Sequence, residues 1–190
     1  MINKGKGKYN NTKTTDRKPH NDKKVDASNP KVRVPGEKTS IQNNRRKELY
    51  TKGFNQIRNA YDNGFFIEAI TIIDSMITDR LEGYVQFLLY GEDKQFVAES
   101  LFNALKSFGS TTKEKNVRDE DFKQIYNKIE GWVPKRNNAV HNFVIIRQDS
   151  LDDSADVRLQ KLKDTADEGL LLVREVMSYT SKRIKIPNEG

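Results

Sequence analysis

Apolar residues recur at every third or fourth position through the segment from Phe65 to Leu89. This spacing places them on one stripe of an α-helix, whereas a half-buried strand would show strict alternation. The stripe consists of Phe66, Ala69, Ile70, Ile73, Met76, Ile77, Leu81, Val85 and Leu88. An apolar stripe of this length has to be covered by other helices, so the segment predicts a helical bundle.

Four further segments have helical character, and glycine or proline marks most of their predicted ends. They are a helix over about residues 41–61, a third from Phe96 to Gly109-Ser110, a fourth that opens near Asp119 and is ended or divided by Pro134, and a last one that is capped by Asp152-Asp153-Ser154 and ends before Pro187. No strand pattern is convincing, although periodicity does not assign the short apolar run Phe143–Ile146. We therefore predict an all-α fold, a four- to five-helix bundle over residues 41–190.

The first 40 residues have a different composition from the rest of the chain. They hold 11 Lys and Arg against 4 Asp and Glu, and residues 41–190 hold 23 of each, so the formal net charge of +7 lies in this segment. Almost no large apolar residue is present there, which predicts a disordered basic tail. Its lysines would attract the phosphates of RNA, and a leader that only improves solubility is the alternative. The candidate RNA-binding residues are Lys4, Lys6, Lys8, Lys23, Lys24 and, beyond the tail, Lys135.

Composition excludes several classes of site. The chain has no cysteine, which rules out disulfides, cysteine zinc sites and thiol nucleophiles. No apolar run approaches the roughly 20 residues that a membrane span needs, and no signal-peptide core opens the chain. We expect a cytoplasmic protein with no membrane partner. No metal-ligand cluster is evident, so we expect neither a metal nor another cofactor.

The segment Arg136-Asn137-Asn138-Ala139-Val140-His141 contains the one histidine outside the tail. Histidine can give or take a proton near neutral pH. Arginine can hold a phosphate at two points and stabilise the charge that develops as the phosphate reacts. Arg136 and His141 are therefore candidate catalytic residues for cleavage of RNA, although such a spacing also arises by chance.

Arg136, Asn137 and His141, at the head of a helix late in an all-α bundle, resemble the HEPN superfamily. Its motif is an arginine, a spacer of four to six residues and a histidine, commonly with a polar residue directly after the arginine. The resemblance implies a metal-independent endoribonuclease of a toxin or anti-phage defence type, or a catalytically silent relative that binds RNA or a partner protein. It also implies a regulatory antitoxin, protein or RNA. Where one branch of the family has a modifiable tyrosine, this chain has Phe143, which puts that form of silencing in doubt.

Cleavage by internal transesterification needs both a base and an acid, and one imidazole does not readily serve as both. A homodimer would bring two copies of His141 into one cleft. On a helix, Asn137 and His141 share a face and Arg136 lies about 100° round from Asn137. Asn137 would then orient the site, while Arg136 would reach across to the shared cleft.

Less specific interpretations remain open. In one of them, His141 is a helix residue that hydrogen-bonds to a carboxylate, and Arg136 belongs to a surface ion pair. Three acidic residues of the second predicted helix, Asp74, Asp79 and Glu82, read mostly as a solvated face, yet two of them would be able to pair with Arg136 or His141. The chain would then be a helical interaction protein unrelated to the HEPN superfamily.

Overall fold

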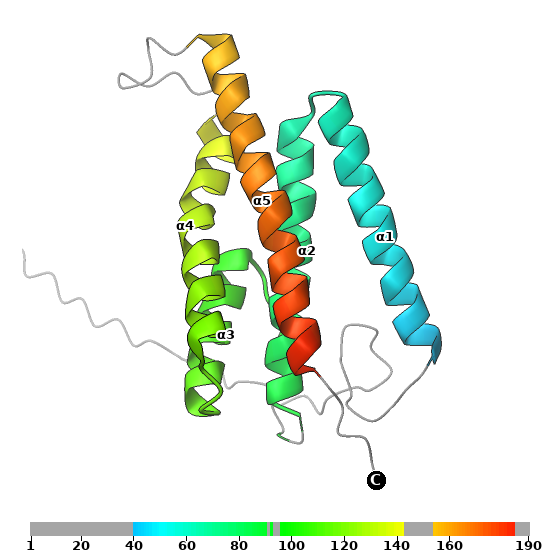
Figure 1. Cartoon of the computed structure of the whole chain (residues 1–190), viewed down its shortest axis with the longest axis vertical. Helices are drawn as coiled ribbons and strands as arrows, with labels where there is room; N and C mark the ends of the chain where they lie inside the picture. Colours follow the sequence, from blue (N-terminus) through cyan, green and yellow to red (C-terminus); the bar gives the residue numbers. More distant parts are fainter. Residues whose placement is uncertain (1–39, 91, 93–95, 143–153, 185–190) are drawn as a thin grey trace, which may run out of the picture.

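A computed structural model describes residues 40–90, 92, 96–142 and 154–184 (Figure 1). These residues form five helices and no strand: α1 (Ser40–Asp62), α2 (Phe66–Leu88), α3 (Leu101–Glu114), α4 (Glu120–Asn142) and α5 (Ala155–Arg183). The all-α prediction is confirmed for this part of the chain. The predicted tail and the run Phe143–Ile146 lie outside the described residues, so the division of the chain near residue 40 stays a prediction.

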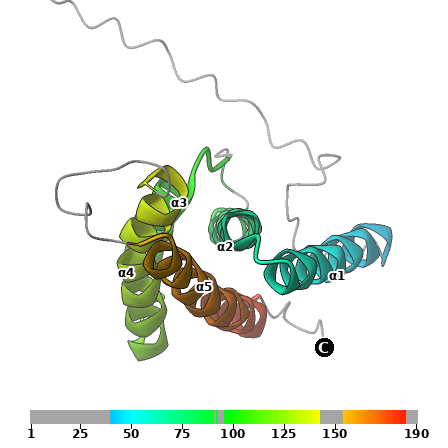
Figure 2. The same ribbon diagram turned by 90° about the horizontal axis from the view of Figure 1, so that it is seen from above.

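Helix α2 is the centre of the bundle. It packs against α1, α3, α4 and α5, and Figure 2 shows it between α1 on one side and α3 and α4 on the other. The predicted stripe faces these neighbours. Its most completely buried members are Ala69, Ile70, Ile73, Ile77, Leu81 and Val85. None of the described helices is long and apolar enough to cross a membrane.

Helix α3 differs from its prediction at both ends. It begins after Ser100, whose side chain accepts a hydrogen bond from the backbone N–H of Asn103, so Phe96 lies outside the helix. It also continues through Gly109 to Glu114. A methyl group at Gly109 would lie 3.0 Å from Cε2 of Tyr126 on α4. The glycine therefore provides room for an aromatic ring, and it does not end the helix.

Helix α4 begins as predicted, because Asp119 accepts a hydrogen bond of 2.7 Å from the backbone N–H of Phe122. The prediction that Pro134 ends or divides this helix is wrong, since α4 continues through Pro134 to Asn142. A proline removes one backbone hydrogen bond, here to the carbonyl of Glu130. Both residues are exposed, so that carbonyl faces solvent. The two residues after the proline, Lys135 and Arg136, are anchored by ion pairs to α5 and α2.

Three helices meet at Gly169 of α5. A methyl group there would lie 2.6 Å from Cζ2 of Trp132 on α4 and 3.1 Å from Cγ2 of Ile73 on α2. Trp132 is completely buried, and its indole N–H donates a 3.0 Å hydrogen bond to the carbonyl of Thr165. This tryptophan is therefore a core residue and is not available for stacking on bases.

The Gly169→Ala substitution is expected to destabilise the protein by about 1–3 kcal/mol, because the added methyl overpacks the contact with Trp132. Gly131→Ala is the matched control. Gly131 is exposed on α4, and a methyl group there meets nothing within 4 Å. The control is expected to gain about 0.5–1 kcal/mol from higher helix propensity. Urea unfolding followed by circular dichroism measures both, and equal gains for the two variants would contradict the packing argument.

Candidate functional site

Arg136 points from α4 toward α2 and is largely covered. Its Nη2 donates to Oδ2 of Asp74 at 2.7 Å, and its Nη1 donates to Oδ1 of Asn137 at 2.7 Å. The side chains of Arg136 and Asp74 are 25% and 12% exposed. The predicted arginine therefore belongs to a half-buried ion pair between two helices, which is close to the simpler interpretation of the motif.

Asp74 is the partner of Arg136, and the sequence prediction assigned it mostly to a solvated face. It stands inside the buried stripe of α2, between Ile73 and Met76, where a carboxylate needs a cationic partner. Burial raises the pKa of Asp74, and the charge and hydrogen bond of Arg136 oppose that rise. Oδ1 of Asp74 and Nε of Arg136 are buried and have no hydrogen-bond partner among the described residues. The pair is thus close in distance but incompletely satisfied.

His141 lies on the last turn of α4 and is exposed. Five residues of helix separate it from Arg136, a rotation of about 140°, so the two side chains leave α4 in different directions. Asn137 is also exposed, and it shares its face with His141 as predicted. Within one chain, the structure brings Asn137 to Arg136 and leaves His141 apart from the ion pair.

The end of α4 also decides which groups can hold a phosphate. The expectation that Pro134 would separate the motif from the preceding helix is wrong, because the motif occupies the C-terminal end of α4. Free backbone N–H groups that bind phosphate occur at the N-terminal end of a helix. A phosphate near His141 would therefore depend on side chains.

The remaining predicted site residues divide into two groups. The ammonium group of Lys135 forms an ion pair of 2.7 Å with Glu168 on α5, so its charge is already countered. The other lysines predicted to bind RNA lie outside the described residues; these are Lys4, Lys6, Lys8, Lys23 and Lys24.

The three acidic residues of α2 that were named from the sequence, Asp74, Asp79 and Glu82, are not a solvated face. Asp79 accepts a hydrogen bond from the hydroxyl of Tyr50 on α1. Glu82 is buried and accepts a 3.0 Å hydrogen bond from the backbone N–H of Ala98. Together with Asp74, these carboxylates join α2 to three different parts of the bundle. One of the three pairs with Arg136, which is one of the possibilities that the sequence left open.

No family model, curated protein or solved structure matches the chain. The resemblance to the HEPN superfamily therefore depends on the motif and the helical layout alone. Within the described residues, no group of three or more histidine and acidic side chains is placed to hold a metal ion. The chemistry that these side chains offer consists of an exposed imidazole, an amide on the same face and a guanidinium fixed by a carboxylate.

The Arg136→Met substitution is expected to destabilise the protein by about 3 kcal/mol at neutral pH, because it leaves the buried carboxylate of Asp74 without a counter-charge. Adding Asp74→Leu is expected to recover most of that loss, since an apolar pair needs no desolvation of charge. Urea unfolding of the two single variants and the double variant forms the cycle that measures the coupling. Simple additivity of the single effects would show that the pair contributes nothing.

The loss in Arg136→Met is expected to depend on pH. Without the arginine nothing opposes the effect of burial, so the pKa of Asp74 in the folded protein lies further above its unfolded value of about 3.9. Protonation of Asp74 then stabilises the folded state. This stabilisation is complete below the pKa that Asp74 has in the unfolded chain, and it is lost as the pH rises through the pKa that Asp74 has in the folded protein. Unfolding measured at a series of pH values from about 4 to about 7 should show a growing deficit. A constant deficit would mean that Asp74 is not the group responsible.

Proposed function

We propose that the protein is a metal-independent endoribonuclease. The observation that supports this proposal is the exposed His141 at the end of α4, with Asn137 one turn before it on the same face and the guanidinium of Arg136 held beside Asn137. In the proposed reaction a base removes the proton of an RNA 2′-hydroxyl, and the 2′-oxygen bonds to the adjacent phosphorus. The bond to the 5′-oxygen breaks, and an acid protonates that oxygen. The products are a 2′,3′-cyclic phosphate and a free 5′-hydroxyl, and DNA is spared because it lacks the nucleophile.

The proposed enzyme is a homodimer. A single chain turns Arg136 and His141 away from each other around α4, and it places one exposed histidine on this helix. In a two-fold assembly the His141 of one chain serves as base and that of the second chain as acid. Arg136 would then face the cleft from the side of its own chain.

Arg136 retains part of its capacity to bind a phosphate. A guanidinium has five N–H donors, and Asp74 and Asn137 accept from one Nη nitrogen each. One N–H on each Nη is left, and the side chain is 25% exposed. In this proposal Asp74 positions the arginine, Asn137 orients it toward the histidine face, and the two Nη donors that remain contact the phosphate.

His141→Ala tests the proposal with little risk to the fold, because the side chain is exposed. The variant is expected to lose about 10²–10⁴ in the rate of RNA cleavage in the presence of EDTA, as removal of a general acid–base typically does. His20→Ala, at the other histidine of the chain, is the matched control and should retain full activity. The 2′,3′-cyclic phosphate is identified because the 3′ ends of the products resist ligation until the cyclic phosphate is removed.

A second candidate function is a non-catalytic module that binds RNA or a partner protein. The ion pairs favour it, because Asp74 counters the charge of Arg136 and Glu168 counters that of Lys135. If wild type and His141→Ala leave varied RNAs equally intact, the module replaces the enzyme as the proposal. The ribonuclease proposal includes four further parts. These are a toxin or defence role, an antitoxin partner, a cytoplasmic location and RNA binding by the lysines of residues 1–40.

A further inference from the structure

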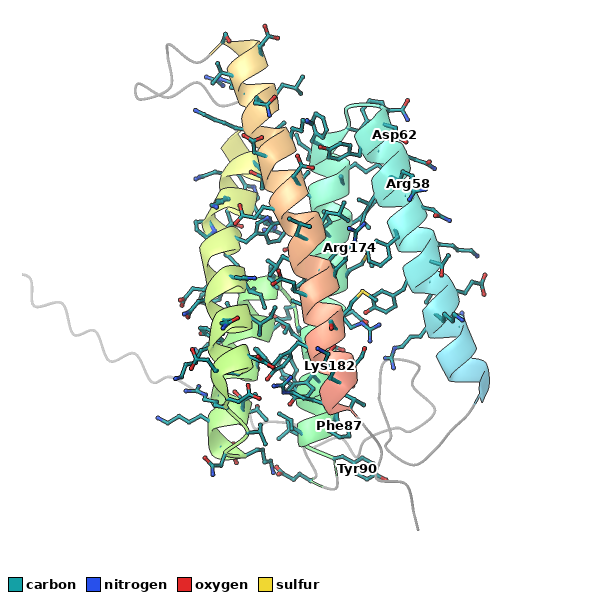
Figure 3. All side chains as sticks on the ribbon, viewed as in Figure 1. Arg58, Asp62, Phe87, Tyr90, Arg174 and Lys182 are labelled. Carbon is teal, nitrogen blue, oxygen red and sulfur yellow. The ribbon has the colours of Figure 1, made fainter. Side chains whose placement is uncertain are left out.

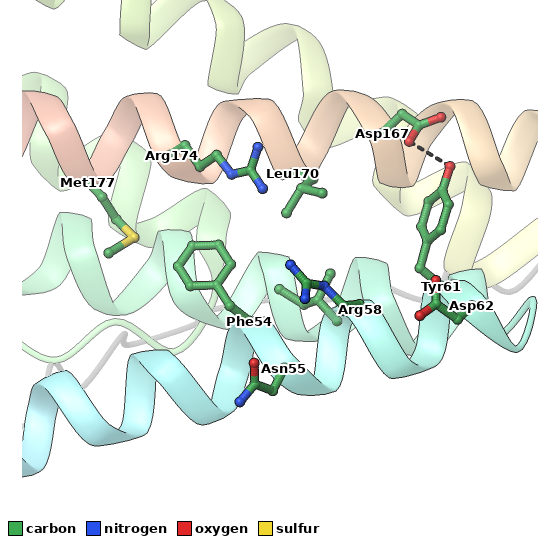
Figure 4. Close-up of a pocket in the computed structure, with 10 residues that line it drawn as sticks. Phe54, Asn55, Arg58, Tyr61, Asp62, Asp167, Leu170, Arg174 and Met177 are labelled. Carbon is green, nitrogen blue, oxygen red and sulfur yellow. Dashed lines mark hydrogen bonds between the residues drawn. The ribbon is translucent and has the colours of Figure 1, made fainter.

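Helices α1 and α5 border a groove of about 570 Å³. Both helices pack on α2 but not on each other, so side chains of α1 and α5 face one another across this space (Figure 4). A hydrogen bond of 2.6 Å from the hydroxyl of Tyr61 to Oδ1 of Asp167 connects the two walls at one end. A volume of this size is typical of sites for small molecules.

One part of the groove is apolar. Phe54 on α1 and Met177 on α5 line it, and Leu170 adds a smaller apolar surface on the other side of Arg174. All three are only partly buried although they pack against the core. In Figure 4 the phenyl ring of Phe54 and the thioether of Met177 extend toward one another. Covering this surface would remove apolar area from water, which favours binding of an apolar body.

Two arginines extend into the middle of the groove. Arg58 lies on α1 and Arg174 on α5, so the two side chains come from opposite walls of the groove (Figures 3 and 4). Neither makes an ion pair or a hydrogen bond with any described residue, whereas Arg136 pairs with Asp74 and Arg183 pairs with Asp119. Two unpaired guanidinium groups on facing walls form a two-sided grip for an oxyanion.

The end of the groove beyond the arginines is acidic. Asp62 and Asp167 line it, and Tyr61 keeps its proton because burial and the hydrogen bond to Asp167 raise its pKa to about 12. The hydroxyl donates to Asp167, and this hydrogen bond crosses the groove at this end. The sequence of environments is apolar, then cationic, then anionic.

We propose that the groove between α1 and α5 binds a small amphipathic acid, a single carboxylate on an apolar body. The carboxylate lies between Arg58 and Arg174, and the apolar body covers Phe54 and Met177. The acidic end excludes a second negative charge beyond the arginines, so the site selects a monoanion. This site uses none of the residues of the proposed ribonuclease and stands whether or not that activity exists.

The same features disfavour larger ligands. An RNA strand carries a phosphate at each nucleotide, and its charges would meet Asp62 and Asp167. A partner helix would find a short site, because residues 54–62 of α1 rise only about 12 Å, and the Tyr61–Asp167 hydrogen bond crosses the path. A compact ligand fits between the Tyr61–Asp167 hydrogen bond and the apolar part.

Methyl NMR of the full chain labelled at methionine and isoleucine tests the proposal, because Met177 lines the groove, whereas Ile129 is buried on α4 outside the groove and serves as the internal reference. The probes are 4-phenylbutyrate and its neutral counterpart 4-phenylbutan-1-ol. Titration with the acid should shift the Met177 signal and leave Ile129 unchanged. The alcohol should bind at least about tenfold more weakly, as expected when a charge-assisted hydrogen bond is lost.

The variants Arg58→Gln and Arg174→Gln should each weaken binding of 4-phenylbutyrate by roughly 5- to 20-fold. Arg45→Gln is the matched control, since Arg45 is an exposed arginine of α1 outside the groove. Equal affinity for acid and alcohol would overturn the proposal, as would unchanged binding in both groove variants. A shift of Met177 by an RNA oligonucleotide but not by 4-phenylbutyrate would also overturn it and assign the groove to a polyanion.

Discussion

The close approach of α5 to Trp132 is the contact on which the rest of the bundle depends. Only a residue without a Cβ fits at position 169, since a methyl group there would come within 2.6 Å of the indole and 3.1 Å of Ile73. The residues next to this contact form the ion pairs. Asp74 follows Ile73 on α2, and Arg136 lies one turn after Trp132 on α4. The packing of an apolar ring thus sets the positions of the charges that surround it.

This geometry explains why the motif residues separate. Arg136 continues the inward face of α4 that Trp132 begins, so a carboxylate on α2 is its nearest partner. His141 lies about 140° round the same helix and is exposed. A helix can direct both side chains to one phosphate only if a second chain supplies one of them. The proposal of a dimer, which the chemistry of one imidazole suggests, thus has a second and geometric argument.

The fold was predictable where a local pattern coincides with the tertiary contact. The stripe of α2 and the capping residues Asp119 and Ser154 are of this kind. Gly109 and Pro134 misled the prediction because glycine and proline usually end helices, whereas here a tyrosine ring and two ion pairs decide the outcome. The partner of Arg136 had a signal in the sequence, an acid inside an apolar stripe. The groove had none, since the facing of α1 and α5 arises only when both pack on α2.

Some arginines of the bundle are paired with carboxylates and others are not, and this difference separates arginines that hold helices together from arginines that remain able to bind a ligand. Where two helices pack closely, as α4 does on α2 and α5, a cation at the contact has to be countered, and the chain supplies Asp74 and Glu168 for this purpose. Helices α1 and α5 do not pack together, so their facing arginines carry no such requirement. An unpaired guanidinium costs little while water solvates it. Arg58 and Arg174 therefore keep their binding capacity for an external anion, whereas Arg136 has committed part of its own to the fold.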